Sequence, residues 1–325
     1  MNFFADDKIF NLHTELKKAV GEYRNVRGFK PSDYIDAKIE KLTQYMRHYS
    51  LTACVIAISG GIDSAVTYAI ASKAKQVKDS PIKKIVPIFL PVYKSEGATN
   101  QEEARKKAEE LIEEFGGESL TEIDISPIHR LLKETVDERM GVHGQAWAAG
   151  QLVSYLRTPT YYYVTSLLSE QGFRPIVCGT TNRDEGAYLG YFGKASDGMV
   201  DIQMISDLHK SETYQVAKYL GVPQSIIKAI PTGDMYDNRS DEEVFGAPYD
   251  FVELYLQYLN MNRLQQYEFY QSLSKDAAEQ FIVLKKNVDD LHNYNKHKYL
   301  GASPAVHLDV IEGKVKGGWV YNNYE

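Results

Sequence analysis

Residues 59–64 read Ser-Gly-Gly-Ile-Asp-Ser and join a run of β-forming residues, 54–58, to a stretch rich in helix formers, 64–76. Gly60 and Gly61 have no Cβ, so their backbone can approach a ligand closely. The amides at the start of the following helix have no helical partner, and the helix dipole favours an anion there. This junction therefore predicts a phosphate-binding turn.

The polar side chains of the same junction refine the prediction. Ser59 and Ser64 add hydroxyl donors on both sides of the glycines. Asp63 would repel a phosphate directly, but it is well suited to hold a Mg²⁺ ion between protein and phosphate. The alternative is a plain strand-to-helix turn that Ser59 or Asp63 caps.

Two common nucleotide loops do not fit this junction. The P-loop pattern would place a lysine beside the last hydroxyl residue, and the dinucleotide fingerprint would read G-x-G-x-x-G. Neither is present at residues 59–64. The junction therefore indicates another kind of phosphate loop.

Strand and helix patterns alternate along the first two thirds of the chain, which predicts an α/β fold with a parallel sheet and helices on both faces. In such sheets ligands bind at the carboxyl ends of the strands, where the 59–64 junction lies. Beyond residue 205 the pattern becomes mostly helical. The strands are expected at 54–58, 83–91, 118–126 and 174–179, and the helices at 34–49, 64–76, 99–117, 127–140 and 145–170.

Prolines and caps add local expectations. Pro87 fits a strand only at a sheet edge or bulge, and Pro159 predicts a break in the helix over 145–170. Thr99 or Asn100 can cap the helix that follows them, and Gly116 can end it.

Composition excludes several function classes. The 325 residues carry a net charge of −7 and a pI of about 5.7, which disfavours a nucleic-acid surface. The two cysteines, Cys54 and Cys178, lie in apolar runs without a C-x-x-C pair, which makes a cysteine zinc site improbable. The sequence shows no signal peptide and no apolar window of roughly 20 residues, so we expect a cytoplasmic protein without membrane association.

The S-G-G-x-D-S motif resembles that of the ATP pyrophosphatases, which cut ATP between the α- and β-phosphates and adenylate a substrate. A second block, 179–213, is similar to the signature of the NAD synthetases. It contains Gly179-Thr180, Glu185, "FGKASDG" at 192–198 and "LHK" at 208–210.

Two further segments carry the same resemblance. "PTGDMYD" at 231–237 resembles the family's P-T-x-D-L motif, and "YNKHKYLGASPA" at 294–305 its H-K loop. The resemblance therefore implies a family domain over 35–310. Residues 1–34 are expected to be an N-terminal extension and 311–325 a C-terminal tail.

The resemblance implies an enzyme that joins nicotinic acid adenine dinucleotide, ATP and ammonia into NAD, AMP and pyrophosphate. Asp63 and Glu185 match the family's Mg²⁺ ligands, although a helix N-terminal acid is the alternative for Glu185. Lys210 matches a lysine that touches the ATP phosphates, with a solvated lysine as its alternative.

The resemblance also implies a set of binding residues. The implied catalytic residues are Asp63, Lys210 and Asp197. The implied ATP and pyrophosphate contacts are Ser59, Gly60, Gly61, Ile62, Asp63, Ser64, Thr180 and Lys210. The implied acceptor contacts are Arg157, Lys194, Asp197, His297 and Lys298. For Lys194 and Asp197 an ordinary "KASDG" turn is the alternative.

The chain departs from the family pattern at two nucleotide-binding positions. Where many members carry an R-x-R pair, this chain has Tyr155 and Arg157, and Phe89 stands where an arginine often ends the second strand. The acceptor could therefore be nicotinate mononucleotide, or aromatic residues could build the adenine pocket.

The resemblance implies a homodimer that forms around the tyrosine-rich segment 147–168. Only about 50 residues precede the loop, and Cys54 lies inside the leading strand, so no glutaminase domain is expected. Ammonia would be free or supplied by a separate partner. The remaining alternatives are an amide ligase for another carboxylate and a non-catalytic nucleotide-binding protein.

Overall fold

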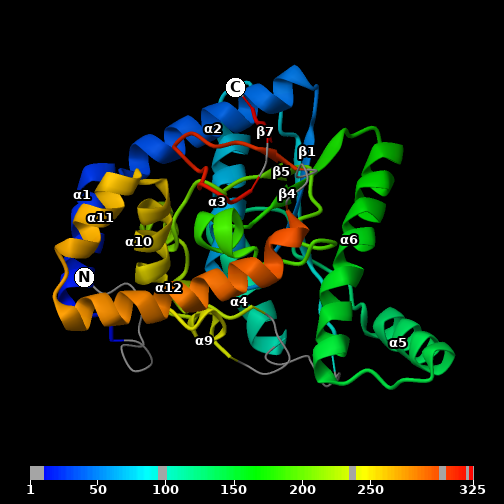
Figure 1. Cartoon of the computed structure of the whole chain (residues 1–325). Coiled ribbons are helices and arrows are strands. Elements are labelled where there is room, and N and C mark those ends of the chain that lie inside the picture. Colours follow the sequence, from blue (N-terminus) through cyan, green and yellow to red (C-terminus); the bar gives the residue numbers. More distant parts are fainter. Residues whose placement is uncertain (1–10, 94–100, 234–238, 300–304, 320–321, 325) are drawn as a thin grey trace.

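The structure is a computed structural model, and it describes residues 11–93, 101–233, 239–299, 305–319 and 322–324. The described strands form one parallel sheet in the order β3-β2-β1-β4-β5-β6-β7, with helices around it (Figure 1). The predicted α/β class is confirmed. The strands are β1 (Ala53–Ala57), β2 (Lys84–Phe89), β3 (Thr121–Glu122), β4 (Pro175–Gly179), β5 (Ile202–Gln203), β6 (Val306–His307) and β7 (Asn322–Asn323).

From α2 to α6 the helices follow the predicted pattern, α1 was not predicted, and the C-terminal half is mainly helical. Gly116 ends α4 with φ +61°, as predicted, whereas Thr99 and Asn100 lie outside the described residues. The helices are α1 (Thr14–Arg27), α2 (Pro31–His48), α3 (Ile62–Gln76), α4 (Gln101–Phe115), α5 (Ser126–Met140), α6 (Ala146–Glu170), the π-helical turn η1 (Glu185–Leu189), α7 (Lys210–Leu220), α8 (Gln224–Ile227), α9 (Asp241–Phe245), α10 (Tyr249–Asn260), α11 (Arg263–Gln271), α12 (Lys275–Asn295) and the 3₁₀ turn η2 (Lys296–Lys298).

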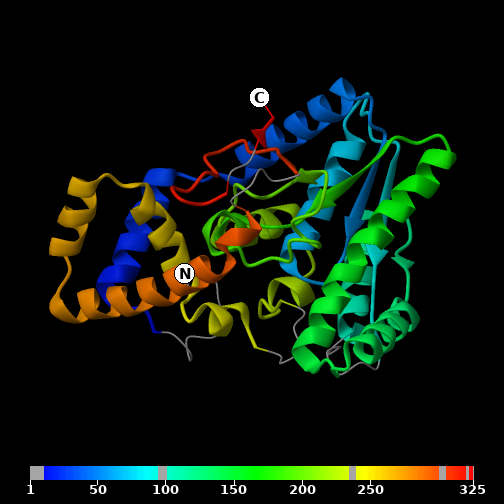
Figure 2. The ribbon, with the colours of Figure 1, turned by 45° about the vertical axis from the view of Figure 1, so that its right-hand side comes forward.

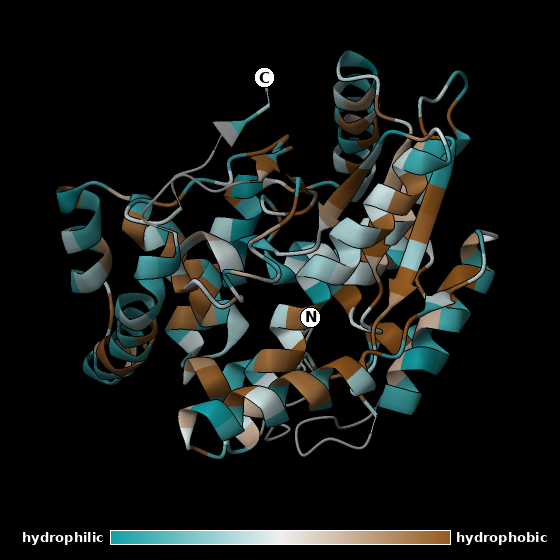
Figure 3. Cartoon of the chain, turned by 90° about the vertical axis from the view of Figure 1, so that its right-hand side faces the viewer, coloured by the Kyte–Doolittle hydropathy of each residue, from teal (hydrophilic) through white to brown (hydrophobic). Residues whose placement is uncertain are grey.

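The interior strand β1 separates two hydrophobic cores. Cys54 and Ile56 pack with α2, α3, α4 and α7 on one face, and Val55 packs with α6 on the other. This division follows from the period of two in a strand, and burial of both faces explains why the strand is apolar throughout. In Figure 3 the central strands are coloured mainly brown, as expected for a sheet covered on both sides.

Figure 2 shows a body of helices beside the sheet. A third hydrophobic core lies within this body. There Leu16 and Val20 of α1 pack with Phe251 of α10 and Phe281 of α12. The segment before residue 34 thus contributes to a core, and β7 places part of the C-terminal tail in the sheet. The division into extension, domain and tail stays a prediction.

The predicted helix break at Pro159 is wrong, because α6 runs without interruption from Ala146 to Glu170. A proline inside a helix costs about 3 kcal/mol. Burial of Val153, Leu156 and Tyr161 against the sheet stabilises α6 by about 1.5–3 kcal/mol for each side chain, which outweighs that cost.

Pro87 lies in β2, which is an interior strand. Its missing N–H nevertheless costs the sheet no hydrogen bond, because it faces a side where no described strand pairs with it. The Ile88 carbonyl accepts from the Ile58 amide, so Ile88 faces β1 and Pro87 faces the opposite side. On that side β3 pairs only with Ile88 and Phe89 of β2. The predicted third strand is also shorter than expected, because regular pairing stops after Glu122.

No helix within the described ranges combines the length and apolar character that a membrane span requires. The two cysteines are buried and unpaired, as predicted for small apolar side chains.

Candidate active site

The Ser59–Ser64 loop leaves the carboxyl end of β1 and opens α3. The Ser64 hydroxyl accepts from the Ser59 amide at 3.2 Å and donates to the Gly61 carbonyl at 3.0 Å, and the two serine hydroxyls lie 3.1 Å apart. The first helical bond runs from the Ala65 amide to the Gly61 carbonyl. The amides of residues 62–64 therefore lie outside the helical ladder and can bind an anion.

Gly60 is the residue in this loop that cannot be replaced freely. It adopts φ +81°, and a Cβ would lie 2.9 Å from the backbone of Ala104 in α4. Both the left-handed conformation and the contact with α4 require glycine. Packing of α4 on the loop thus holds the loop close to the sheet.

Three predicted site residues meet beside this loop. The Lys210 ammonium donates to Asp63 Oδ2 at 2.6 Å and to Glu185 Oε1 at 2.8 Å. Asp63 is the second residue of α3, Glu185 begins η1 beyond β4, and Lys210 begins α7. Residues 147 positions apart are therefore joined at the carboxyl ends of β1 and β4, where the parallel sheet predicts a ligand site.

Further polar groups hold these three side chains. The Tyr249 hydroxyl donates to Glu185 Oε1 at 2.7 Å or to Asp241 Oδ2 at 2.8 Å. The Asn182 amide donates to Asp63 Oδ1 at 2.9 Å, and its oxygen accepts from the Glu185 backbone at 3.0 Å. Both oxygens of Asp63 thus have partners.

Burial and charge oppose one another in this cluster. Burial raises the pKa of Glu185 to about 7, while Lys210 lowers it and the neighbouring carboxylates of Asp63 and Asp241 raise it. Burial alone would lower the pKa of Lys210, but Asp63, Glu185 and Asp241 together hold that pKa well above its ordinary value. When Asp63, Glu185 and Asp241 are ionised and Lys210 is protonated, the cluster has a net charge of −2. A further cation is therefore favoured there.

The donor set fits Mg²⁺, which prefers hard oxygen ligands and binds through one or two carboxylates together with phosphates. Within the described ranges, no group of three or more His, Cys, Asp or Glu side chains is placed to hold a metal. Asp63 and Glu185 are instead bridged by the Lys210 ammonium. An ion held by Asp63 and Glu185 therefore requires Lys210 to exchange these carboxylates for another anion.

The predicted acceptor residues lie in separate contacts. Lys298 donates to the carbonyls of Gly190 and Phe192 at 3.2 and 2.9 Å, and its pKa is lowered by burial, against which Asp197 raises it. Asp197 is exposed and accepts from the Gly193 amide at 3.4 Å, as in the turn alternative. Lys298 thus holds the backbone of the segment that contains this turn.

The other predicted contact residues lie on elements outside the contacts described above for the carboxylate cluster. Lys194 is exposed, and exposed His297 bonds the Tyr294 carbonyl at 3.0 Å. Arg157 is half-buried on α6, and Thr180 is half-buried directly after β4. Their roles stay predictions, and the P-T-x-D-L match falls partly on residues 234–238, outside the described residues.

A buried layer behind Lys210 was not predicted. Asp184 accepts from His209 Nδ1 at 2.6 Å and from the Lys210 amide at 2.7 Å. The guanidinium of Arg183 lies 3.3 Å from His209 Nε2 and can only donate, so Nε2 accepts and Nδ1 carries the proton. Burial lowers the pKa of His209 to about 3, which keeps it neutral.

Sequence reasoning missed Asn182, Asp184, Asp241 and Tyr249. Asn182 and Asp184 lie within "GTTNRDEG", part of the 179–213 block described above. Their polar side chains, directly after a buried strand, were the signal that could have identified them. Asp241 and Tyr249 lie in "SDEEVFGAPYD", which offers only helix-capping signals. Their contact with Glu185 depends on packing of α9 and α10.

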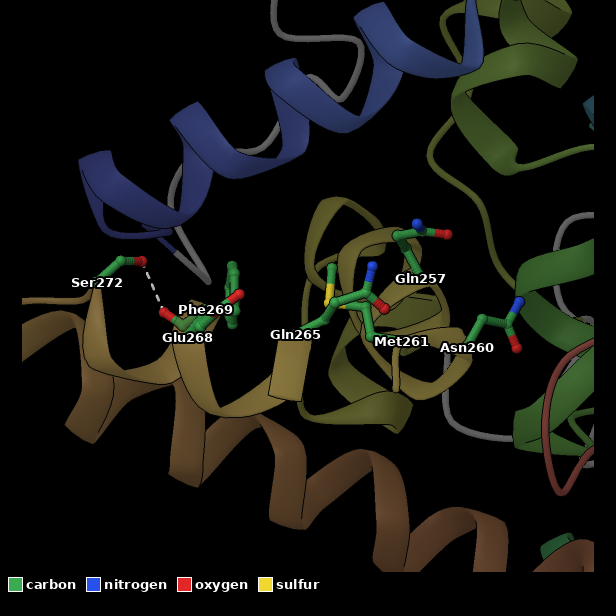
Figure 4. A pocket seen from close by; sticks show the side chains of 7 residues that line it. All are labelled: Gln257, Asn260, Met261, Gln265, Glu268, Phe269 and Ser272. Atoms are coloured by element: carbon green, nitrogen blue, oxygen red, sulfur yellow. Dashed lines mark hydrogen bonds between the residues drawn. The ribbon is translucent and has the colours of Figure 1, made fainter. Parts of the chain in front are cut away.

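A cavity of about 600 Å³ lies elsewhere, beside α10 and α11 (Figure 4). Its charged side chain is the carboxylate of Glu268, so it does not suit a triphosphate. The lining residues are Gln257, Asn260, Met261, Gln265, Glu268, Phe269 and Ser272. None belongs to the predicted site.

Comparison with known proteins agrees with the geometry. The sequence model of the family described as NAD synthase matches residues 34–300. The chain is 32% identical over 217 residues to the NH(3)-dependent NAD(+) synthetase of Thermoplasma volcanium, covering 66% of this chain and 81% of that protein. It is 29% identical over 271 residues to that of Mesoplasma florum, covering 83% and 95%.

A solved structure shows the same architecture. The NMN synthetase from Francisella tularensis superposes with a TM-score of 0.65 at 26% identity, covering 83% of this chain and 96% of that chain. The match to the family model spans most of the chain, and the relatives are ligases that use ammonia. The chain belongs to the NAD synthase family.

Proposed function

We propose that the protein converts the carboxylate of nicotinic acid adenine dinucleotide into the amide of NAD, using ammonia and cleaving ATP to AMP and pyrophosphate. The observation that carries this proposal is the contact of Lys210 with both Asp63 and Glu185 beside the Ser59–Ser64 loop. A lone glycine turn would need no buried lysine between two acids.

The reaction explains why a phosphate loop and an amide-forming enzyme belong together. Ammonia cannot displace an oxide ion from a carboxylate. Attack of the carboxylate oxygen on the α-phosphorus of ATP forms an acyl-adenylate and releases pyrophosphate. Ammonia then attacks the carbonyl carbon, AMP leaves with the oxygen, and the nitrogen loses its excess protons to solvent.

The residues of the cluster have separate tasks in this proposal. The amides of residues 62–64 and the hydroxyls of Ser59 and Ser64 bind the pyrophosphate group. Lys210 turns from the carboxylates to the phosphate oxygens and stabilises the charge that develops on the leaving group. Asp63 and Glu185 are the residues that would hold Mg²⁺, which would neutralise phosphate charge.

Nicotinate mononucleotide is the second candidate acceptor. Phe89, at the position where family members often carry an arginine, is 3% exposed at the end of β2. In addition, the Francisella protein, described as an NMN synthetase, is similar over most of this chain. Amidation of nicotinate mononucleotide would give NMN.

The test compares both acceptors with the purified protein, ATP, Mg²⁺ and ammonium, measuring pyrophosphate release and product mass. We expect release that depends on ammonium and a greater kcat/KM with the dinucleotide. A greater kcat/KM with the mononucleotide would establish the second candidate. ATP binding without pyrophosphate from either acceptor would instead indicate a non-catalytic nucleotide-binding protein.

We further propose a homodimer that forms through α5 and α6. Both helices expose large apolar side chains, and such surfaces usually mark an interface. These side chains are Ile128, Leu131, Leu132, Val136, Met140, Trp147, Tyr155, Tyr163 and Leu167. Light scattering should give twice the chain mass of 36.9 kDa, and a monomer at micromolar concentration would contradict the proposal.

The nitrogen source and the cellular compartment of the protein are part of the same proposal. We infer that ammonia comes from solution or from a separate glutaminase. We also infer that the protein acts in the cytoplasm. Buried unpaired Cys54 and Cys178 agree with a reducing compartment.

A further inference from the structure

The N-terminal helix α1 precedes the region that the family model matches, which begins at residue 34. Its apolar side packs on α10 and α12, as described above. Its last turn and a half presents polar side chains to the start of α7, the helix that begins at Lys210. These contacts involve Tyr23, Arg24 and Arg27.

Tyr23 contacts the N-cap of α7. Its hydroxyl lies 3.0 Å from His209 Nε2, and the two rings meet edge-on at 5.7 Å. Because His209 Nε2 accepts, the Tyr23 hydroxyl donates. The contact therefore extends through His209 to Asp184, which accepts from the Lys210 amide.

Arg27 contacts the capping box of α7. Its Nε donates to Glu212 Oε1 at 2.5 Å, and its Nη2 donates to Glu212 Oε2 at 3.1 Å and to the Asp207 carbonyl at 3.0 Å. Glu212 accepts in turn from the His209 amide at 3.0 Å. Arg27 thus joins the residues on both sides of Lys210.

Arg24 completes the connection through α10. It donates to both carboxylate oxygens of Glu253, one of which also accepts from the Ser211 hydroxyl at 2.8 Å. The N-cap of α7, His209, and residues 211 and 212 of its first turn are therefore each linked to α1, directly or through one side chain.

We propose that α1 is a positioning element that holds the first turn of α7, so that the Lys210 ammonium is correctly placed for the ATP phosphates. The inference rests on the proposed function of Lys210. A lysine at the first helical position is opposed by the helix dipole, so its place depends on the groups around it. Tyr23 and Arg27 act through His209 and Glu212 and are positioning residues.

The polar contacts are separate from the apolar packing of α1. Leu16 and Val20 pack α1 against the helical body. Burying ion pairs adds little stability compared with apolar side chains of similar size, because desolvation offsets their attraction. Arg27 and Glu212 are only 12% and 3% exposed, so their pairing serves to hold geometry.

The first test is Tyr23→Phe, which keeps the ring and removes the hydroxyl. We expect kcat to fall about five- to tenfold, corresponding to one lost hydrogen bond, with the acceptor KM unchanged. The Tm should change by no more than about 3 °C. Tyr219→Phe removes an exposed hydroxyl on the same helix α7 and should leave kcat unchanged.

The second test compares Arg27→Met with Arg27→Lys, assayed well below the Tm of each variant. We expect the methionine variant to lose more activity than Tyr23→Phe and the lysine variant to regain part of kcat. Wild-type kcat in both Tyr23→Phe and Arg27→Met, with Tm lowered in the latter, would overturn the proposal and leave α1 as a stabilising helix. An inactive wild-type protein would instead contradict the proposed function.

Discussion

Replacing Lys210 with methionine is expected to lower kcat for pyrophosphate release by ~10³-fold, or about 4 kcal/mol of transition-state stabilisation. Lys210 is 2% exposed and lies between Asp63 and Glu185, so its charge acts where water screens it poorly. Methionine fills a similar volume without the charge. The measurement is single-turnover pyrophosphate release at saturating ATP.

The variant should remain folded, because a proton can replace the lost charge. Burial already raises the pKa of Glu185 to about 7, and loss of Lys210 removes the charge that lowers it. Glu185 is then protonated at neutral pH. Lys218→Met, at an exposed position of the same helix, is the matched control. A kcat within fivefold of wild type would remove Lys210 from the phosphate site.

Asp63→Asn and Glu185→Gln are each expected to lower kcat by ~10²-fold or more and to raise the Mg²⁺ concentration that gives half-maximal rate. Each substitution keeps the shape of the side chain and removes one negative charge. In Asp63→Asn the remaining oxygen can still accept from Asn182, so the loop retains that contact. A Mg²⁺ titration of the rate at fixed ATP measures both effects.

The control for these two variants is Asp36→Asn, at an exposed position of α2. It should leave both the rate and the Mg²⁺ requirement unchanged. If Asp63→Asn or Glu185→Gln lowers kcat without changing the Mg²⁺ requirement, that residue holds Lys210 and does not bind the ion. Near-normal rates would remove it from the site altogether.

The loop and the elements around it were predictable because their signals are local. Gly60 and Gly61 limit what the backbone at the end of β1 can do, and the apolar run before them indicates a buried strand. The "GTTNRDEG" segment follows β4 in the same way. Since carboxyl ends of parallel strands share one edge of the sheet, Asp63 and Glu185 were expected to lie close together.

Other features depend on tertiary packing. Pro159 is a local signal for a break, and only burial of α6 against the sheet decides that the helix continues. Asp241 and Tyr249 reach Glu185 because α9 and α10 pack there.

The sequence was therefore enough to predict the α/β class, the glycine-containing turn at 59–64 and three charged residues that lie beside it, Asp63, Glu185 and Lys210. Tertiary structure alone decided that Lys210 bridges Asp63 and Glu185, and that Tyr23 and Arg27 hold the helix from which Lys210 projects. Loop chemistry depends on neighbours in the chain, whereas these contacts depend on how distant helices pack.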